Sequence, residues 1–592
     1  MQRRLFILRI FASLVWLNVG MGGSLIEAHS GASVNSAGAQ DTANSQTSAG
    51  SAQTAPSPRS MAEVIERVFK REKEEMEIIA GYSPIVETYI QTVTSNPVMG
   101  VVPKSDDYFL GQADFHGKSM KVHSMLEKTH KLNIMWLFNP VGFLQMAFLD
   151  FGQFDHDHYK LTYRGRVFLG TVRCLLFDVE PIPQSHGFRF FGRIWVEDQD
   201  FTIVRMNGRY LPEIRFSPKH FDDEFYFSFD SWRTNVKYGD WLPYEIYSQD
   251  LRDPTPTGGP RFKAKTHFWG YELSSQIGEQ EFGRLLVESQ SSVKDDSESQ
   301  DRSPLDQQRD WRALSQKNVF EVLERSGLAA PEGDVERVLN TIVNNIMVTN
   351  RFDGRIEKSC RVLLTSNLEM FSVQNTIVLS RGLIDVVPNE ETLAAFLAYE
   401  LADSMVPKPA QDQYGFSDIL RLKPTEAMRK LSFLDTPEEA RRSAERALEL
   451  LRKSPYADKL PNIGLFFAQL QSQLRALKQL VNPRLGNRVF FTAQLLQSAP
   501  ALQPENLEQL SALPMDSRIK INPWSDTVSL MKTNQMGPLS PREKIPFEIT
   551  PISLYLMRYT ESSANVEHTI VPRSAMPVAE MFGQKETLRA KN

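Results

Sequence analysis

The spacing of apolar residues divides the chain into a strand-rich first part and a helical second part. From about Val86 to Leu273 apolar and polar residues alternate, and Phe225, Phe227 and Phe229 are a clear case. A period of two places one apolar face on a strand. The runs GRIWVEDQDFTIVRMNGRY and WRTNVKYGDWLPYEIYSQ each contain two strand-like halves around a polar turn. Hairpin after hairpin predicts one antiparallel, strongly curved sheet.

Beyond about residue 306 the period lengthens to that of helices. The fold class predicted is therefore α+β with two domains, a curved antiparallel half-barrel followed by a mostly helical domain. An earlier helix, ending near Ile79, is expected after Ser60 and Glu63, which form a capping-box signature. The later elements expected are helices at Trp311–Ser326, Asp334–Val348, Asn389–Met405, Pro437–Lys453 and about Gly464–Leu480, and strands at Arg361–Thr365 and Thr376–Ser380.

Composition marks the boundaries between these parts. Residues 29–58 are rich in Ser, Ala, Gly, Thr and Gln, and residues 288–304 are polar and mostly acidic, so both are expected to be linkers. The predicted organisation is a signal peptide at 1–28, a disordered linker at 29–58, the sheet domain at 59–273, a polar linker at 274–305, the helical domain at 306–516 and an extension with a short hairpin at 517–592.

The first residues have the layout of a secretory signal. Arg3 and Arg4 precede an apolar run from about Leu5 to Val19, and small residues follow it. Cleavage near Ala28 is expected, which leaves a soluble protein in the periplasm or cell envelope, at most peripheral to a membrane. The alternative is an uncleaved anchor, but the run is short for a span of about 20 residues.

Charge and cysteine content narrow the possible partners and sites. A net charge of −5 without a long basic run gives no reason to expect nucleic acid. The two cysteines, Cys174 and Cys360, lie far apart and suggest neither a disulfide framework nor a cysteine-based metal site.

One face of the predicted sheet carries many large apolar side chains. They predict either a closed core, where such stripes usually lie, or the interior of a half-open barrel that holds an apolar ligand. The apolar segment Leu132–Phe154 is then a lid over that interior or a buried part of the core. The residues of this possible cavity are Phe168, Leu176, Ile194, Val196, Phe227, Phe229 and Phe268.

The sheet region resembles outer-membrane lipoprotein-sorting proteins of the LolA type. The resemblance is carried by GRIWVEDQDFTIVRMNGRY, with a W-V-x-D turn between strands, by CLLFDVEP before it and by WLPYEIYSQ after it, and covers about residues 85–273. It implies an incomplete barrel, closed by helices, that shelters the acyl chains of a lipoprotein. The partners implied are a lipoprotein, an acyl chain or an unfolded envelope protein.

A short run of histidines and aspartates lies after the apolar segment. His156 and His158, between Asp155 and Asp157, would share one side of a strand. Two ligands of a four-ligand set are a weak metal signal, so a polar loop or strand edge is expected.

The stretch MFSVQNTIVLSRGLIDVVPNEETLAAFLAYELAD resembles metallopeptidase family forty-eight, the HtpX and BepA type. That family places two histidines and a glutamate in H-E-x-x-H on a helix, which binds zinc and activates a water molecule. The resemblance covers about residues 334–455 and puts the glutamate at Glu400. It also implies that the strand Thr376–Ser380 (Thr376, Ile377, Val378, Leu379 and Ser380) could pair with an extended substrate.

The departures from this motif fall on the metal ligands. Tyr399 and Asp403 replace the two histidines, and neither Glu438 nor Glu439 completes the third-ligand motif. No histidine lies between His267 and His568, so substitutes from the same domain are absent. No cofactor is predicted, and the peptidase-like domain is expected to be inactive.

Glu400 nevertheless falls on the apolar side of its helix, in register with Leu393, Phe396, Leu397 and Leu401. A carboxyl group there must be paired, protonated or open to a cleft. The chain is thus expected to be an exported, non-catalytic adaptor or chaperone for lipoproteins or envelope proteins. The competing hypothesis is a metalloendopeptidase that uses Glu400 and an unconventional zinc site.

Overall fold

The computed structural model describes most of two long regions of the chain and some shorter segments near its end. The signal-like segment, the first linker and most of the second linker lie outside the described residues. The described ranges are residues 60–271 and 303–513, both with short gaps, and residues 519–522, 527–530, 547–559 and 571–572.

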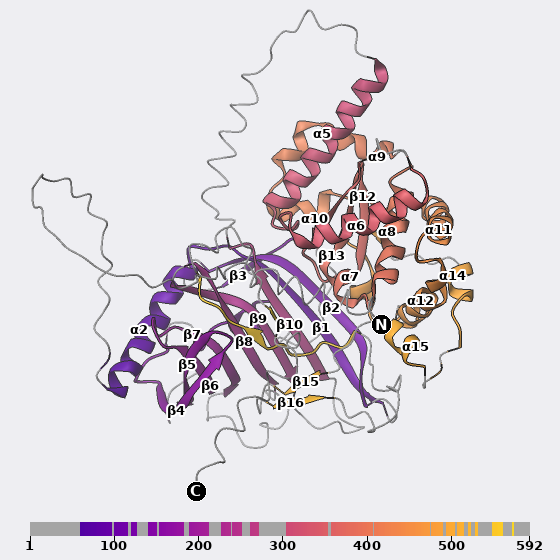
Figure 1. Cartoon of the computed structure of the whole chain (residues 1–592). Coiled ribbons are helices and arrows are strands. Elements are labelled where there is room, and N and C mark those ends of the chain that lie inside the picture. The colour runs from indigo at the N-terminus through magenta and orange to yellow at the C-terminus, as the bar shows by residue number, and fades with distance from the viewer. Residues whose placement is uncertain are drawn as a thin grey trace, which may run out of the picture.

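The first region forms one antiparallel sheet of ten strands, in the order β3-β2-β1-β10-β9-β8-β7-β6-β5-β4. The two ends of this order, β3 and β4, do not pair with each other, so the sheet is open rather than a closed barrel (Figure 1). Its strands are β1 Ile85–Asn96, β2 Gly100–Asp114, β3 Lys121–Ser124, β4 Tyr159–Leu169, β5 Val172–Pro181, β6 Arg189–Glu197, β7 Ile203–Leu211, β8 Phe227–Lys237, β9 Asp240–Asp250 and β10 Arg261–Trp269.

Two helices cover one face of this sheet, called here the inner face. They are α2 (Met61–Ile79) and α3 (Pro140–Gln145), and their apolar residues pack with those of the inner face in a single core. The Ser60 hydroxyl accepts a hydrogen bond from the Glu63 backbone N–H at 3.2 Å, as the capping signature predicted. The inner face is therefore covered by helices.

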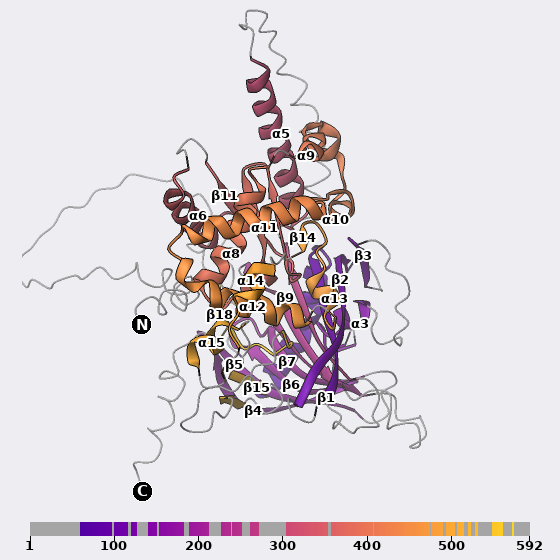
Figure 2. The ribbon, with the colours of Figure 1, turned by 90° about the vertical axis from the view of Figure 1, so that its right-hand side faces the viewer.

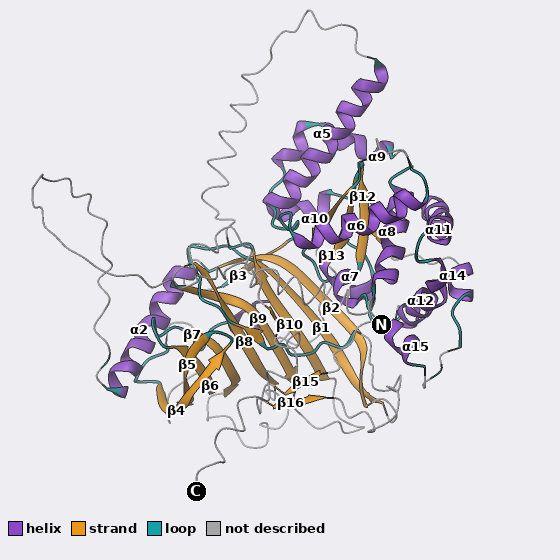
Figure 3. Cartoon of the chain, in the orientation of Figure 1, coloured by secondary structure: helices purple, strands orange, loops and turns teal. Residues whose placement is uncertain are grey.

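The second domain is mostly helical and surrounds a four-stranded sheet, as Figure 3 shows. The strands lie in the order β11-β13-β12-β14, with β11 parallel to β13 and the other pairs antiparallel. Their bounds are β11 Ser359–Leu363, β12 Glu369–Val373, β13 Thr376–Ser380 and β14 Asn487–Arg488. The helices are α5 Pro304–Arg325, α6 Asp334–Thr349, α7 Arg381–Val386, α8 Glu390–Asp403, α9 Pro409–Asp412, α10 Ala427–Lys430, α11 Pro437–Arg452, α12 Leu460–Gln473, α13 Lys478–Val481, α14 Ala493–Gln497 and α15 Leu507–Ala512, with short 3-10 turns between some of them.

The predicted two-domain α+β organisation is confirmed in this form, and two details differ. Helix α5 begins at Pro304, inside the expected linker, because Ser303 caps it and Pro304 suits a first helical turn. The helix expected to reach Leu480 ends at Gln473 and is followed by the short α13. No helix among the described residues is long and apolar enough to span a membrane.

The two domains share one hydrophobic core across the outer face of the large sheet. Tyr89, Tyr108 and Tyr247 pack in the same cluster as residues of α6, α8 and β13. Figure 2 shows the helical domain above the long strands β1 and β2. The domains are therefore joined by packing as well as by the chain.

A buried carboxylate adds a polar link between the domains. Glu87 of β1 accepts hydrogen bonds from the Ser366 N–H, the Ser366 hydroxyl and the Tyr108 hydroxyl, each at 2.6 Å. It also pairs with Arg381 at 3.2 Å. A group with this many partners is well satisfied despite being only 2% exposed.

The last well-described segment, residues 547–559, runs back across the outer face of the large sheet (Figure 1). At one end the Gln91 side chain accepts from the Ile549 N–H at 2.9 Å. At the other end the Thr171 N–H donates to the Leu556 carbonyl at 2.9 Å, and the Tyr559 N–H donates to Asn235. We call this segment the C-terminal strap.

The strap completes a second outer core that is rich in tryptophan. Leu554 and Leu556 pack with Trp195, Trp232 and Trp241. The guanidinium of Arg205 lies 4.2 and 4.4 Å from the ring centres of Trp195 and Trp232. The hairpin predicted in the extension forms as β15 (Ile519–Asn522) and β16 (Thr527–Leu530), and β17 (Leu554–Tyr555) in the strap pairs with β18 (Val571–Pro572).

Candidate functional site

Helix α8 carries the altered metal motif and lies in the interior of the second domain. Its N-cap is Asn389, whose side-chain oxygen accepts from the Thr392 N–H at 3.0 Å. Every residue from Thr392 to Asp403 is buried, because α11 covers one side and β12 and β13 lie on another. The sequence predicted one apolar face on this helix, but the helix is buried on every side, because small and apolar residues occur all around it.

The carboxyl group of Glu400 is fully buried and unusually isolated. Neither oxygen meets a donor at full hydrogen-bond geometry among the described residues, although the Asn487 side chain lies close enough to lower the pKa of Glu400. Burial raises its pKa well above the ordinary value of 4.5, and the charge of Asp403 raises it further, while Lys408 lowers it. Burial therefore favours the neutral acid form of Glu400, which is compatible with its position on a helix surrounded by apolar residues.

Asp403, one turn further along, is in contrast fully partnered. It accepts hydrogen bonds from the Ser372 hydroxyl of β12 at 2.7 Å and the Ser443 hydroxyl of α11 at 3.3 Å. It also forms a close ion pair with Lys408. The residue at the second ligand position is thus held by a cation and two hydroxyls.

Lys408 joins this carboxylate to a second one, Asp435. Its ammonium lies 2.6 Å from Asp435 Oδ1, and only 12% of the side chain is exposed. Burial alone would lower the pKa of Lys408, but Asp403 and Asp435 raise it above its usual value. Asp435 also exchanges hydrogen bonds with Asn487 of β14, whose amide donates at 2.7 Å and whose oxygen accepts from the Asp435 N–H at 2.7 Å.

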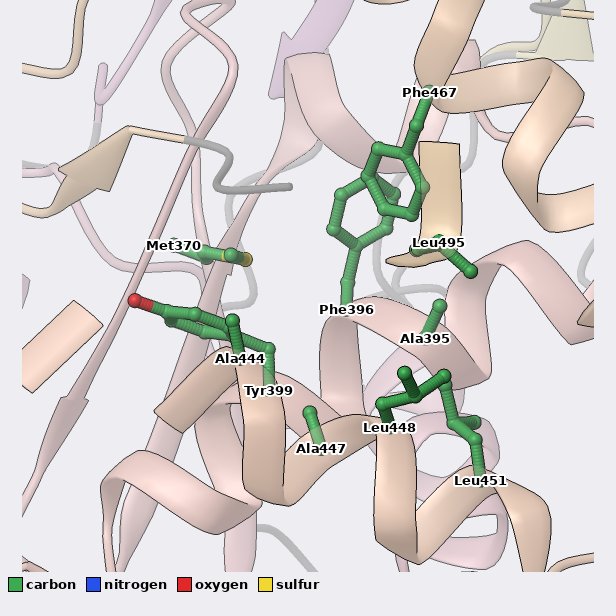
Figure 4. Close-up of a pocket in the computed structure, with 10 residues that line it drawn as sticks. All are labelled: Met370, Ala395, Phe396, Tyr399, Ala444, Ala447, Leu448, Leu451, Phe467 and Leu495. Carbon is green, nitrogen blue, oxygen red and sulfur yellow. The ribbon is translucent and has the colours of Figure 1, made fainter. Parts of the chain in front are cut away.

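Tyr399, at the first ligand position, lies beside a small apolar pocket between α8 and α11 (Figure 4). The pocket has a volume of about 30 Å³, room for little more than a water molecule. Burial raises the pKa of the Tyr399 phenol far above 10, so it stays protonated and is a poor metal ligand. The lining residues are Met370, Ala395, Phe396, Tyr399, Ala444, Ala447, Leu448, Leu451, Phe467 and Leu495.

These residues do not fit a catalytic zinc ion. The ammonium of Lys408 lies between the two carboxylates, where it supplies the positive charge that a metal would supply. Glu438 is 71% exposed, and Glu439 is engaged in the N-terminal cap of α11 with Thr436. The position of α11 that faces Asp403 is Ser443, a hydroxyl rather than a third acidic ligand.

The strand Thr376–Ser380 has no free edge for a substrate. It forms β13, which pairs with β11 on one side and with β12 on the other. All five of its residues are buried. On the far edge of β12, β14 pairs with its first residues and the Gln411 side chain donates to the Ser372 carbonyl at 2.9 Å. An extended substrate therefore cannot pair with β13 in this structure, because both edges of the strand are already paired.

The apolar set of the large sheet divides into three groups. Ile194, Val196, Phe229 and Phe268 lie in the inner core with α2 and α3. Leu176 packs instead on the outer tryptophan cluster, and the side chain of Phe227 in β8 lies outside the described residues.

Phe168 is the sixth described member, and it is 58% exposed. A bulge between Tyr163 and Gly165 shifts the register of β4, so Val167 joins the outer cluster. Alternation then turns Phe168, its neighbour, toward the inner side at the end of an edge strand. Phe168 is therefore exposed because it lies at the end of an edge strand, where no neighbouring strand covers it.

The second half of the segment Leu132–Phe154 lies over the inner face, and residues 127–139 lie outside the described part. Phe143, Leu144 and Phe148 are buried in the inner core. Polar contacts anchor the segment, since the Tyr210 hydroxyl donates to the Phe148 carbonyl at 2.5 Å and Arg189 pairs with Asp150. The segment thus covers the inner face.

The His and Asp run before β4 forms local contacts. Asp155 accepts from the backbone N–H groups of Asp157 and His158 at 3.0 and 3.1 Å, and His156 pairs with Glu66 of α2. Among the described residues no group of three or more His, Cys, Asp or Glu side chains is arranged to hold a metal ion.

Lys408, Asp435 and Asn487 were not singled out by the sequence. They come from three segments that are far apart in the chain and meet only in the folded domain. No motif or period marks them. A lysine five residues after Asp403 is the only local hint.

Comparisons with known proteins give limited further information. No family model and no curated protein matches the chain. A DUF1329 family protein from Desulfovibrio piger is similar over 35% of this chain and 91% of its own, with 10% identity and a TM-score of 0.18.

MucB in complex with MucA(peri) is similar over 36% of this chain and 94% of its own, with 9% identity and a TM-score of 0.12. The Pseudomonas aeruginosa MucA/MucB complex gives 35% and 94%, with 9% identity and a TM-score of 0.12. At TM-scores of this size the likenesses assign neither a fold nor a function to this chain.

Proposed function

We propose that this protein is an exported, non-catalytic binding protein that acts as an adaptor or chaperone for lipoproteins or envelope proteins. The observation that carries the proposal is the position of Lys408 between Asp403 and Asp435. Zinc hydrolysis needs three protein ligands and an open position for water. A site filled by an internal ammonium offers neither, so we infer that the domain serves binding rather than cleavage.

The inner side of the large sheet supports the binding part of this proposal. Its core is apolar, and α3 with the residues after it covers that core. Phe168, on the same side, is exposed at the end of edge strand β4. An exposed aromatic residue beside an apolar interior suits an acyl chain or an apolar segment of a protein.

A photo-crosslinking experiment tests where the ligand binds. A photoreactive phenylalanine analogue replaces Phe168 in one variant of the full chain and Phe416 in a control. Phe416 is 62% exposed but lies on the second domain. Irradiation in the native envelope is expected to give lipid or protein adducts at Phe168 and far fewer at Phe416. Equal yields at both sites, or none at either, would contradict a ligand on the sheet domain.

Native mass spectrometry of the full chain tests the non-catalytic part. The expected result is protein without a stoichiometric metal ion, together with bound lipid or a partner. One equivalent of zinc, combined with cleavage of an unfolded substrate that Glu400→Gln abolishes, would overturn the proposal in favour of a metalloendopeptidase.

A further inference from the structure

We propose that the Lys408 ammonium is the built-in cation of an oxygen-lined site, and that it keeps a hard divalent cation out. Removal of this ammonium would let Mn²⁺, Mg²⁺ or Ca²⁺ take its place between Asp403 and Asp435. This inference concerns the second domain alone and does not depend on what the sheet domain binds.

Several separate segments contribute to the site. Glu400 and Asp403 come from α8, and Asp435 precedes α11. Lys408, just before α9, contacts both aspartates. The hydroxyl of Ser372 in β12 completes the surroundings on the sheet side at 2.7 Å from Asp403. The remaining oxygens near the aspartates belong to Ser443 and Asn487.

The charge balance explains why a cation must be there. Asp403 and Asp435 have nearly fully buried side chains, 0% and 2% exposed, and both touch the same ammonium. Two such carboxylates without a cation between them would repel each other in a medium that screens charge poorly. Lys358, the other lysine near Asp403, bonds instead to Asn375 and to the Ser404 carbonyl.

Glu400 is a separate observation which indicates that the cluster holds more oxygen atoms than the Lys408 ammonium uses. Both of its oxygens are buried, meet no donor at full hydrogen-bond geometry among the described residues and lie within the field of Asp403, Lys408 and Asp435. Lysine offers only three donors, whereas a divalent cation commonly takes six or more oxygen ligands. No three acidic side chains of the described residues converge on one point, so Glu400 would join a coordination shell by a shift of its side chain toward the two aspartates.

The donor atoms define the class of cation. In the part of the chain that the structure describes, the polar groups that contact Lys408, Asp403 and Asp435 are carboxyl, hydroxyl and amide groups rather than imidazoles or thiolates. Oxygen donors suit Mg²⁺, Ca²⁺ and Mn²⁺, while zinc in proteins is usually bound through nitrogen and sulfur as well. Mn²⁺, Mg²⁺ or Ca²⁺ is thus expected to raise the Tm of a variant that lacks the ammonium by more than Zn²⁺ does.

The test compares the wild-type chain with Lys408→Ala in thermal unfolding, with and without each cation, and in Mn²⁺ binding followed by electron paramagnetic resonance. Wild-type protein is expected to show no change in Tm and no bound Mn²⁺. Lys408→Ala is expected to unfold at a lower temperature and to regain about 2–4 °C or more with excess Mn²⁺. The Lys408→Ala, Asp403→Asn double variant should lose this response.

Three outcomes would overturn the inference. They are Mn²⁺ bound by the wild-type chain and lost with Asp403→Asn, a folded Lys408→Ala variant that ignores every cation, and a Lys408→Arg variant that binds Mn²⁺ although it keeps the charge. If Lys408→Ala folds only in the presence of Mn²⁺, the inference is supported directly. Each of the overturning results would leave the photo-crosslinking test of the sheet domain unaffected.

Discussion

At the scale of single residues, the second domain keeps an acid where most proteins keep an apolar side chain. Among the described residues Glu400 meets no donor at full hydrogen-bond geometry, whereas Asp403 one turn away has a cation and two hydroxyls. The same helix therefore holds two buried carboxyl groups in different surroundings. Burial raises the pKa of Glu400 and favours its neutral form.

This contrast predicts a pH dependence that Glu400→Gln removes. The folded-state pKa of Glu400 is raised above 4.5, so the folded protein holds a proton that the unfolded chain releases. Stability is therefore lost as pH rises above about 4.5 and on toward the folded-state pKa. The amide has no such proton, so Glu400→Gln should gain about 1 kcal/mol or more over wild type at pH 8 and little at pH 4.

Urea unfolding across this pH range checks the prediction, with Glu438→Gln as the matched control. Glu438 is 71% exposed on α11, and its replacement should leave the pH profile unchanged. A profile for Glu400→Gln parallel to that of wild type would show that Glu400 is ionised in the folded protein.

The residue scale also shows what the sequence could and could not predict. The cap of α8 by Asn389 and the burial of Glu400 follow from local pattern, because both depend on residues within a few turns. Lys408 and Asp435 could not be assigned, since their meeting depends on how α8 and α11 pack. The differences from the H-E-x-x-H pattern were visible in the sequence, and the ammonium between Asp403 and Asp435 was not.

At the scale of elements, the inner face is closed by two helices that meet at one arginine. Arg233 of β8 donates to both carboxylate oxygens of Glu72 in α2, at 2.7 and 2.6 Å. It also donates to the Ala147 carbonyl, just after α3, at 3.3 Å. Because Arg233 and Glu72 are 1% and 4% exposed, neither can turn to water if the other is removed.

Removal of one partner of this pair should therefore cost more than removal of both. Arg233→Met is expected to lower the free energy of unfolding by about 3–5 kcal/mol, because Glu72 is left buried without a partner. The double variant Arg233→Met, Glu72→Met should recover most of that loss. Denaturant unfolding of the two single variants and the double variant measures the coupling, and additive losses would argue against a buried, paired Arg233.

At this scale, strand register and strand order limit what the sequence pattern predicts about the sheets. Strand existence followed from alternation, but Phe168 is exposed at the end of edge strand β4, and Leu176 faces the outer cluster. A change of one residue in register exchanges the two faces of a strand. The central position of β13 was equally hidden, because one of its two neighbours, β12, was not expected from the sequence.

At the scale of the whole molecule, the strap and the shared core make the two domains one unit. Leu556 is 2% exposed and packs in the tryptophan cluster, while its neighbour Met557 is 47% exposed. The pair offers a matched test of what the strap contributes, since both residues lie in the same segment.

Leu556→Asp should lift the strap from the sheet, because a carboxylate at this position would be buried without a partner. The free energy of unfolding should fall by about 3 kcal/mol or more. Tryptophan fluorescence should shift to the red, because Trp195, Trp232 and Trp241 become exposed to water. Met557→Asp should change both by little. Unchanged fluorescence in Leu556→Asp would mean that the strap does not seal this cluster.

The strap also sets an order in time. The tryptophan side chains of β6, β8 and β9 are synthesised early, but the leucines that cover them come near the end of the described chain. Domains generally begin to fold as they emerge during synthesis. Until residues 547–559 are synthesised, the apolar side chains of this outer face stay exposed to solvent. A chain that stops before these residues would therefore be recognised early by chaperones and proteases. Docking of the strap is thus a late step in the folding of the described sheet domain.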